Sequence, residues 1–429
     1  MKLAELKNKQ IAIWGFGVEG RATAQYLTKH KIGFKILCRE CEVDNNYICI
    51  TASIDKKLLN SFDVIIKSPG ISPYTQLNKE TKTPMTSPTA IWFANEKNTQ
   101  VIAVTGTKGK STTASLLAHI LTSCGKTVNL VGNIGQALIA SGSEYDFIVL
   151  EASSFQIYDG NIAADIAVIT NLFAEHVDWH CGSENYFRDK LQILDTAQIK
   201  IINGKDVTLG KLVDAKGVIY FNHASGFQVV DEALIYQKNQ ILNLSQVKLM
   251  GAHNLQNIGA ALSVCLQLNL DIDLCLDAVK LFQPLAHRLQ YLGKIGRNYA
   301  INDSIATTPI ATLAAMETVD LATTTLLVGG YDRGNDWLDF AVAINAAPPK
   351  LLLLSGQNAG VIFQHLKSIN AVFTYILCDN LTEAIYQAQL KSCSGSTILL
   401  SPGAPSFDQF DSYIQRGEFF EQKLKAYAG

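Results

Sequence analysis

Short apolar runs alternate along the chain with longer stretches in which apolar residues recur at helical spacing. The apolar runs predict β-strands at residues 10–14, 34–38, 63–67, 101–105, 147–151, 166–170, 325–328, 351–355 and 396–400. Strands that alternate with helices are typical of parallel sheets covered by helices. The pattern therefore predicts an α/β fold.

The turns after several of these strands are rich in Gly, Asn or Ser. Open α/β sheets bind ligands at the carboxyl ends of their strands, so we expect the function to reside in these turns. Nucleotide-type turns begin at Gly15 and Gly106, and a further α/β unit begins after Pro284. At about 150 residues per domain, 429 residues favour three domains. We predict domains at residues 1–88, 89–286 and 287–429.

Charge is nearly balanced, with 36 Lys and Arg residues against 38 Asp and Glu residues. The chain therefore has no large net charge that would attract it to nucleic acid or to anionic lipid. Hydrophobic residues make up 48% and charged residues 17%, which excludes a disordered chain. No apolar run reaches the ~18 residues that span a bilayer, and residues 1–10 lack a signal-peptide core. We expect a cytoplasmic protein without membrane insertion.

The cysteines favour reduced thiols over a disulfide framework. There are nine of them, an odd number scattered along a chain with a well-sized core. Cys38 and Cys41 have CxxC spacing. A redox or metal role would need a second pair or an adjacent helix N-terminus, so we interpret the spacing as coincidence.

The first glycine-rich turn has the spacing of a dinucleotide fingerprint. Gly15, Gly17 and Gly20 form GxGxxG between a predicted strand and a predicted helix, which allows backbone N–H groups to approach phosphate. Glu40 lies where a ribose-binding acid of an NAD site would lie, whereas Arg39 would suit a phosphate. NAD, another diphosphate nucleotide and a purely structural turn all remain open. The turn 68–70 (SPG) is expected to line the same crevice.

The second glycine-rich turn is the strongest motif in the chain. Residues 105–113 (TGTKGKSTT) follow a predicted strand and precede a helix predicted at 114–122. In such a P-loop the backbone cradles a triphosphate, Lys110 reaches the β and γ phosphates, and the Ser111 hydroxyl ligates Mg²⁺. Val104 stands where the general pattern has its first Gly, so Gly106 takes over that place.

A magnesium-dependent site also needs carboxylates at neighbouring strand ends. Glu151 ends the run 147–151 and fits this role, since a buried carboxylate without a cation is costly. His176 and His180 have the spacing of a zinc-protease pair, but Val177 replaces the required Glu. We therefore predict that one histidine lies near Mg²⁺ or a phosphoryl group, with a surface-loop histidine as the alternative.

Together these motifs resemble the Mur ligases over essentially the whole chain, and most closely the branch that adds glutamate to UDP-N-acetylmuramoyl-L-alanine. The motifs that carry the resemblance, in order, are 105–112 (TGTKGKST), 132–135 (GNIG), 151–156 (EASSFQ), 171–178, 253–257, 287–288, 302–304 and 401–403. The resemblance implies a Rossmann-like first domain that binds UDP, a central ATPase domain and a Rossmann-like third domain that binds the amino acid. The resemblance also implies that the first glycine-rich turn binds UDP and not NAD.

The resemblance also implies roles for individual residues. Those expected around ATP are Gly106, Thr107, Lys108, Gly109, Lys110, Ser111, Thr112, Asn257, Arg288 and Asp303. Those expected to hold metal are Ser111, Glu151, His176 and Lys190, the last as a carbamate. Those expected to act in catalysis are Lys110, His176 and Lys190. Those expected to bind the UDP-sugar are Gly15, Phe16, Gly17, Arg39, Ser68, Gly70 and Asn133. From its helical spacing alone, Lys190 would flank an apolar face and merely snorkel, with its amine reaching the solvent.

The expected glutamate-binding residues are Thr307, Arg333, Ser406 and Tyr413. Here the chain departs from the D-glutamate branch. Ile305 stands where that branch commonly has a lysine, and Arg333 replaces another lysine. A guanidinium group and an ammonium group bind a carboxylate with different geometry, so the replacement of lysine by arginine is not neutral. We expect glutamate as the substrate, with D-glutamate preferred and L-glutamate as the alternative.

The resulting hypothesis is an ATP-dependent ligase of peptidoglycan precursor synthesis that forms an acyl phosphate. ATP and Mg²⁺ are the expected cofactors, the UDP-sugar and glutamate are the expected partners, and the protein is expected to be a monomer. The alternatives are a folylpolyglutamate-synthase-like ligase, a non-catalytic nucleotide-binding protein and a nicotinamide dehydrogenase. Domain closure is expected about the hinge at 284–288.

Overall fold

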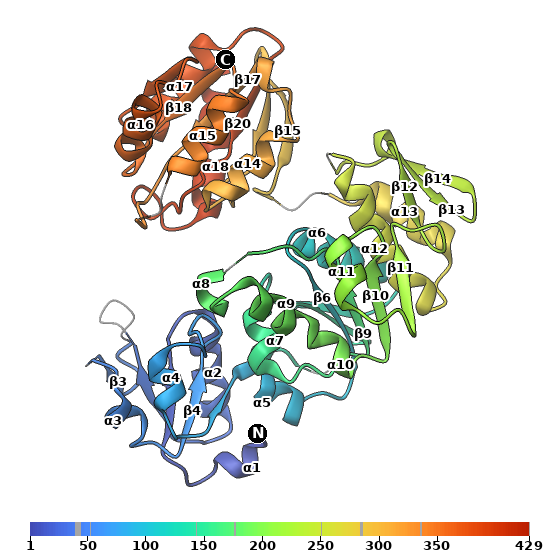
Figure 1. The fold of residues 1–429 in the computed structure, drawn as a ribbon, viewed down its shortest axis with the longest axis vertical. Coiled ribbons are helices and arrows are strands. Elements are labelled where there is room, and N and C mark those ends of the chain that lie inside the picture. The colour runs from blue at the N-terminus through green and yellow to red at the C-terminus, as the bar shows by residue number, and fades with distance from the viewer. Residues whose placement is uncertain are drawn as a thin grey trace. The chain divides into compact units, whose positions relative to one another are not determined.

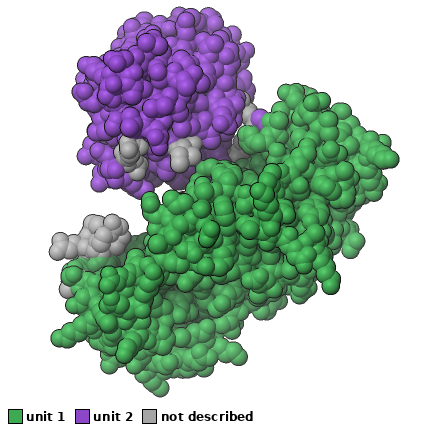
Figure 2. Space-filling model, viewed as in Figure 1, with its two compact units in different colours: residues 1–248, 252–282 green, residues 249–251, 283–429 purple. Residues whose placement is uncertain are grey.

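The structure, a computed structural model, describes residues 1–38, 44–51, 53–142, 144–175, 177–249, 251–283, 286–334 and 337–428. It divides into two compact units, one of residues 1–248 and 252–282 and the other of 249–251 and 283–429 (Figure 2). Each unit contains mainly parallel strands together with helices (Figure 1), so the predicted α/β class is confirmed. The division into two units does not test the three predicted domain ranges, which remain predictions.

The first sheet of unit 1 has the order β3-β2-β1-β4-β5, and all its strands are parallel. This is the strand order of a Rossmann-like half. Its strands are β1 (Ile11–Trp14), β2 (Lys35–Leu37), β3 (Cys49–Ile50), β4 (Val64–Lys67) and β5 (Met85–Thr86). The accompanying helices are α1 (Leu3–Leu6), α2 (Val18–Lys29), α3 (Lys56–Leu59), α4 (Gln76–Glu80) and α5 (Pro88–Asn95).

The second sheet of unit 1 has the order β11-β10-β9-β6-β8-β7 and is also parallel. Its strands are β6 (Gln100–Thr105), β7 (Val128–Gly132), β8 (Phe147–Glu151), β9 (Ile166–Ile169), β10 (Ile199–Asn203) and β11 (Val218–Phe221). Its helices are α6 (Lys110–Ser123), α7 (Ser154–Gly160), α8 (Val177–His180), α9 (Ser183–Leu191), α10 (Ile193–Thr196), α11 (Val207–Leu212), α12 (His253–Gln267) and α13 (Ile272–Leu281).

An antiparallel sheet of β12 (Gln228–Val230), β13 (Ala233–Tyr236) and β14 (Asn239–Asn243) completes unit 1. Helix α6 begins at Lys110, four residues before the predicted start, because the last P-loop residues form its first turn.

Unit 2 contains one sheet of order β15-β16-β20-β17-β18-β19, in which only β15 is antiparallel to its neighbour. Its strands are β15 (Gln290–Ile295), β16 (Asn298–Asn302), β17 (Thr324–Val328), β18 (Leu351–Leu354), β19 (Tyr375–Leu377) and β20 (Thr397–Leu400). Its helices are α14 (Pro309–Met316), α15 (Leu338–Ala346), α16 (Ala359–Ser368), α17 (Leu381–Lys391) and α18 (Tyr413–Ala428). Short 3-10 turns occur at Leu138–Ala140, Leu244–Gln246 and Leu321–Thr323.

Strand pairing brings the candidate turns together. Strand β1 lies beside β4, so the turn at Gly15 and the turn at Ser68 meet at one sheet edge. Strand β6 lies between β8 and β9, so the P-loop is flanked by Glu151 on one side and by the segment after β9 on the other. Strands β1, β4, β6 and β8 are buried along nearly their whole length, which explains why they are continuous apolar runs in the sequence.

Candidate active site

The P-loop is a tight turn between β6 and the N-terminus of α6. Gly106 and Gly109 have φ angles of 143° and 84°, which favour glycine. A Cβ on Gly109 would lie 2.4 Å from Asn257 Oδ1, so this side chain closes directly over the loop. No side chain caps the N-terminus of the 14-residue helix α6. A helix N-terminus of this kind is suited to bind phosphate.

The P-loop is held in shape by the segment that follows β9. The backbone N–H groups of Thr107 and Lys108 donate to Asn171 Oδ1 over 3.1 and 2.8 Å. The Asn171 amide donates in return to the carbonyl of Lys108 over 3.0 Å. Lys108 also forms an ion pair of 2.8 Å with Glu175. The loop is therefore fixed by protein contacts alone.

The side chains expected to meet the nucleotide lie around this turn. Lys110 Nζ donates to the carbonyl of Thr107 over 2.9 Å, and Ser111 is 3% exposed. Asn257 in α12 accepts from Thr113 over 3.3 Å and donates to Asn254 over 2.9 Å. The first turn of α6 and α12 are thus tied together beside Gly109.

Glu151 lies at the end of β8 and is fully buried. Its Oε1 accepts from the Asn133 amide over 3.1 Å, and Asn133 N–H donates to the Glu151 carbonyl over 3.0 Å. A Cβ on Gly132 would lie 2.3 Å from that carbonyl, which explains the glycine before Asn133. Glu151 Oε2 is buried and has no hydrogen-bond partner among the described residues. A buried carboxylate oxygen without a donor is suited to a cation.

Lys190 in α9 is 2% exposed and points at the P-loop rather than to solvent. Its Nζ donates to the Gly106 carbonyl over 3.0 Å and to Thr105 Oγ1 over 3.3 Å, and lies 5.0 Å from the Tyr186 ring. Burial, with the nearby Lys110 charge, holds the pKa of Lys190 well below its usual range. The interpretation of Lys190 as a snorkelling side chain is therefore wrong.

His176 lies outside the described residues. The described residues contain no group of three or more His, Cys, Asp or Glu side chains that could hold a metal. His180 is fully buried, with Nδ1 2.8 Å from Asp189 Oδ2 and Nε2 2.9 Å from Ser154 Oγ. It is therefore not a surface-loop histidine.

The first glycine turn resembles the P-loop in its backbone, because it also contains a glycine with positive φ and leads into a helix. Gly15 has φ 92°, and its carbonyl accepts from Ser68 Oγ over 3.0 Å. A Cβ on Gly20 would lie 2.1 Å from the Gly15 carbonyl oxygen, so the helix starts in close contact with the turn. Gly17 is the N-cap of α2, without a side-chain hydrogen bond. The Phe16 side chain is 1% exposed and belongs to the core, so only its backbone is available to a ligand.

The other residues expected to bind the UDP-sugar are placed in part. The Gly70 carbonyl accepts from Trp179 Nε1 over 3.1 Å. Asn133 lies at Glu151, in the second sheet of the same unit. Arg39, together with the Glu40 and Cys41 positions considered above, lies outside the described residues.

In unit 2, Asp303 lies at the carboxyl end of β16 and is held from two sides. Its Oδ2 accepts from Ser401 Oγ over 2.8 Å, and its Oδ1 accepts from Leu289 N–H over 3.0 Å. Burial raises the pKa of Asp303 to about 6. Arg288 Nε, next to Leu289, is buried without a hydrogen-bond partner among the described residues.

The loops with the expected glutamate-binding residues meet at the same edge of this sheet. Tyr413 accepts through its carbonyl from Ser304 Oγ over 2.8 Å, and the buried Arg416 donates to Ser304 Oγ and to the Ala404 carbonyl over 3.0 and 2.9 Å. Tyr331 N–H donates to the Pro405 carbonyl over 2.8 Å.

The four glutamate candidates differ in how deeply they are buried. Ser406 is 2% exposed, whereas Arg333 is exposed and Thr307 is half-buried. In the part of the chain that the structure describes, no hydrogen bond joins the side chains of Thr307, Arg333, Ser406 and Tyr413 to one another. Their role in binding remains a prediction.

Comparisons with known proteins agree with this architecture. Residues 104–265 match the Mur ligase middle domain. The UDP-N-acetylmuramoyl-L-alanine--L-glutamate ligase of Xanthomonas euvesicatoria pv. vesicatoria is 35% identical over 451 aligned residues, which cover 98% of this chain and 96% of that protein. The chain belongs to the Mur ligase family.

Solved Mur ligase structures share the fold. The UDP-N-acetylmuramate-alanine ligase MurC of Thermotoga maritima matches with a TM-score of 0.61 at 18% identity, covering 98% of this chain and 100% of that one. The MurF ligase of Thermotoga maritima, solved in complex with ADP, matches with a TM-score of 0.59 at 14% identity, covering 99% and 96%. The predicted α/β fold, in which a P-loop sheet follows one Rossmann-like sheet and precedes another along the chain, is confirmed. Among the described residues of this Mur ligase, no helix has the length and apolarity that a membrane span requires.

Two groups of residues at the site were missed by the sequence analysis. Glu19, within the first glycine turn, accepts from Gln156 Nε2 over 2.6 Å, and burial raises its pKa. A charged residue inside a glycine-rich turn is a signal that could have drawn attention to it. Tyr74 and Asp189, whose contact is described below, had no such signal, since their pairing depends on the tertiary fold.

Proposed function

We propose that this Mur ligase joins glutamate to the alanyl carboxylate of UDP-N-acetylmuramoyl-L-alanine at the expense of ATP. The observation that carries the proposal is the group of Lys110, Glu151 and Lys190 at the carboxyl edge of the second sheet. The name of the 35% identical Xanthomonas relative supports the same reaction. Formation of an amide from a free carboxylate is uphill in water, so the carboxylate must first be activated.

In the first half of the reaction, an alanyl carboxylate oxygen attacks the γ-phosphorus of ATP, and the bond to the β,γ-bridging oxygen breaks. The products are an acyl phosphate and ADP. The backbone N–H groups at the start of α6 hold the phosphates, and Lys110 exchanges its contact with the Thr107 carbonyl for the γ-phosphate. The preformed loop holds the reactants in line, a contribution that reaches about 7–11 kcal/mol in favourable cases.

The donor set fits Mg²⁺. The unpartnered Oε2 of Glu151 and the nearby hydroxyl of Ser111 are oxygen ligands of the kind that this ion prefers. When bound, Mg²⁺ would supply positive charge against the phosphate oxygens. Glu151 keeps its other oxygen on Asn133, and this contact orients the carboxylate. His176 remains a proposed second ligand from the family resemblance.

Lys190 is proposed to carry a carbamate. Its lowered pKa, caused chiefly by burial, favours the neutral amine over the ammonium form more than in an exposed lysine. A neutral amine combines with CO₂, forms an N–C bond and releases one proton. The product places an anionic carbamate beside the P-loop. Activity of the wild type is expected to rise with bicarbonate at low pH, and a Lys190→Ala variant is expected to regain activity with small carboxylic acids.

In the second half of the reaction, the glutamate amine attacks the acyl carbon, and the bond to the phosphate oxygen breaks. The amine loses a proton and inorganic phosphate leaves. We propose that Thr307, Arg333, Ser406 and Tyr413 hold the glutamate carboxylates, with Arg333 as the cationic partner. Arg288 and Asp303 are proposed to contact ATP.

We further propose L-glutamate as the amino acid, the alternative to the D-glutamate first expected. Two observations support it. The Xanthomonas relative is named for L-glutamate. Ile305 and Arg333 replace two lysines common in the D-glutamate branch, so the grip on the substrate carboxylates differs.

The decisive experiment measures phosphate release and the ligated product with ATP, UDP-N-acetylmuramoyl-L-alanine and either glutamate enantiomer. We expect ADP and a new amide with L-glutamate, and much less with D-glutamate. Release that does not depend on the UDP-sugar would contradict the acceptor, and a preference for D-glutamate would contradict the stereochemistry alone. We also propose that the protein acts in the cytoplasm as a monomer, and light scattering in solution checks the monomer.

A further inference from the structure

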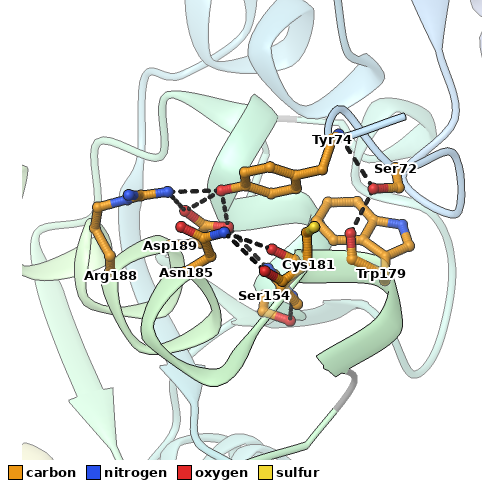
Figure 3. Close-up of polar contacts among 9 residues, drawn as sticks. Ser72, Tyr74, Ser154, Trp179, Cys181, Asn185, Arg188 and Asp189 are labelled. Atoms are coloured by element: carbon orange, nitrogen blue, oxygen red, sulfur yellow. Dashed lines mark hydrogen bonds and ion pairs between the residues drawn. The ribbon is translucent and has the colours of Figure 1, made fainter. Parts of the chain in front are cut away.

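The turn after β4 is fastened to the segment that leads to Lys190. Trp179 donates through Nε1 to the Gly70 carbonyl over 3.1 Å. The Trp179 carbonyl in turn accepts from Ser72 Oγ (Figure 3). The indole stacks on Phe155 with ring centroids 4.3 Å apart. The turn that carries Ser68 and Gly70 is therefore clamped from the side of the second sheet.

A second contact lies four residues after Gly70. The Tyr74 hydroxyl lies 2.7 and 2.9 Å from the two carboxylate oxygens of Asp189, and Arg188 Nη2 donates to that hydroxyl over 2.8 Å (Figure 3). Asp189 is fully buried and directly precedes Lys190 in α9. A buried carboxylate needs such donors, because without them its desolvation is uncompensated.

The chain of contacts continues into the second sheet. Asp189 Oδ2 lies 2.8 Å from His180 Nδ1, and His180 Nε2 lies 2.9 Å from Ser154 Oγ. Ser154 begins α7, three residues after Glu151. The Ser154, His180 and Asp189 side chains are 3%, 0% and 0% exposed. A substrate therefore cannot reach this hydrogen-bonded Ser–His–Asp series, and it does not form a nucleophilic site. Its effect is to fix the positions of the elements it joins.

We propose that Tyr74 and Asp189 are positioning residues that set the turn after β4 at a fixed place relative to Lys190 and Glu151. The inference rests on the proposed function, in which the UDP-sugar must extend from the first sheet to the P-loop. The phosphoryl group travels between two separately bound substrates, so a small shift of the turn misaligns the alanyl carboxylate. A misplacement of ~1 Å at such a site can cost as much as 10²-fold in rate.

The test is a Tyr74→Phe variant, which removes only the hydroxyl. We expect kcat/KM for UDP-N-acetylmuramoyl-L-alanine to fall by about tenfold while KM for ATP stays within about twofold. Tyr158→Phe is the matched control, because its ring packs 5.6 Å from that of Tyr74 while its hydroxyl makes no hydrogen bond among the described residues. This control is expected to behave like the wild type.

Asp189 is tested by a pair of variants. Asp189→Asn keeps an acceptor for Tyr74 and is expected to retain most of the activity, whereas Asp189→Ala is expected to lose at least as much as Tyr74→Phe, because its contact with His180 is lost as well. A double variant Tyr74→Phe, Asp189→Ala is expected to lose little more than Asp189→Ala alone, since both changes remove the hydrogen bond between Tyr74 and Asp189. Losses that simply multiply would overturn the pairing.

A measurement that does not depend on catalytic activity distinguishes this inference from the proposed function. Hydrogen–deuterium exchange of the segment 68–75 is expected to become faster in Tyr74→Phe and to stay unchanged in Tyr158→Phe. Unchanged exchange in Tyr74→Phe, or an equal rise of KM for ATP and for the UDP-sugar, overturns the positioning role. Absence of ligation by the wild type, with the expected exchange difference, overturns the proposed function and leaves the mechanical link standing.

Discussion

Two strand–turn–helix units of this chain share the same backbone features at the turn but differ in their surroundings. The turn after β1 and the turn after β6 both contain glycines with positive φ, and both lead into a helix whose N-terminus has no side-chain cap. Either turn can therefore present N–H groups to a phosphate. The difference lies in the side chains that surround the two turns.

The two turns differ in the ionisable groups that lie in and beside them. Lys110, Glu151 and Lys190 all lie at the P-loop, but the segment 15–20 contains a single ionisable residue, Glu19. A glycine turn by itself supplies binding. Phosphoryl transfer also needs charges held in a dry environment, where they interact strongly.

The largest effect should come from removing the P-loop cation. Lys110→Ala is expected to lower the rate of ADP formation by about 10³-fold, because charge that develops on the transferring phosphoryl group loses its partner. UDP binding, measured by calorimetry, should be unchanged, since the first turn is a separate site. An equal loss of UDP affinity would break the comparison between the two turns.

The next largest effect concerns the cation site. Glu151→Gln is expected to lower the rate by about 10²-fold at a fixed Mg²⁺ concentration, because a neutral amide binds the ion weakly. The same change should raise the unfolding temperature of the metal-free protein, since a buried carboxylate oxygen without a donor is removed. Unchanged Mg²⁺ dependence of the rate would argue against Glu151 as a ligand, and Asn133→Ala provides a control for lost orientation.

A glycine-to-alanine substitution in each turn tests the two turns separately. Gly20→Ala places a Cβ 2.1 Å from a backbone oxygen, and Gly109→Ala places one 2.4 Å from the Asn257 side chain. We expect destabilisation by about 1–3 kcal/mol in each case, larger for Gly20 because a backbone atom cannot move aside. Gly20→Ala should weaken UDP binding alone, and Gly109→Ala should weaken ATP binding alone. Loss of both ligands in either variant would mean that the turns are coupled.

A further effect, on stability and not on activity, is expected in unit 2, which contains neither turn. The pKa of Asp303 is raised by burial to about 6, against about 3.9 for an unfolded chain. The folded state therefore binds more protons between these values, so stability falls as the pH rises from 4 to 6, by ~2–3 kcal/mol at most. Denaturant unfolding at several pH values measures the fall. Asp303→Asn should abolish it, and Ser401→Ala should move it to higher pH, because a hydrogen bond that favours the carboxylate is lost.

The strands and the central site could be predicted because their signals are local. Buried parallel strands are continuous apolar runs, and a P-loop is a fixed sequence of glycines, lysine and serine between a strand and a helix. The position of Glu151 followed from the same logic, since it ends a predicted strand. Short edge strands such as β3 and β5, with two residues each, were not predicted, because so few residues carry no periodicity.

Contacts between distant segments could not be predicted in the same way. The burial of Lys190 against the Gly106 carbonyl depends on how α9 packs on the second sheet, and helical spacing alone suggested an exposed position. Tyr74 and Asp189 are 115 residues apart in sequence, and neither belongs to a motif. The handedness of the amino acid is equally inaccessible, since it depends on the side-chain geometry of loops that meet only in the fold.

One asparagine determines when the P-loop acquires its shape. Asn171, which follows β9, provides hydrogen-bond partners for the loop, because its side-chain amide both accepts from and donates to the P-loop backbone. The conformational entropy of the loop is thus lost when the protein folds and not when ATP arrives. Nucleotide should therefore encounter a rigid receptor, and its association should be a single fast step without a slower ordering phase.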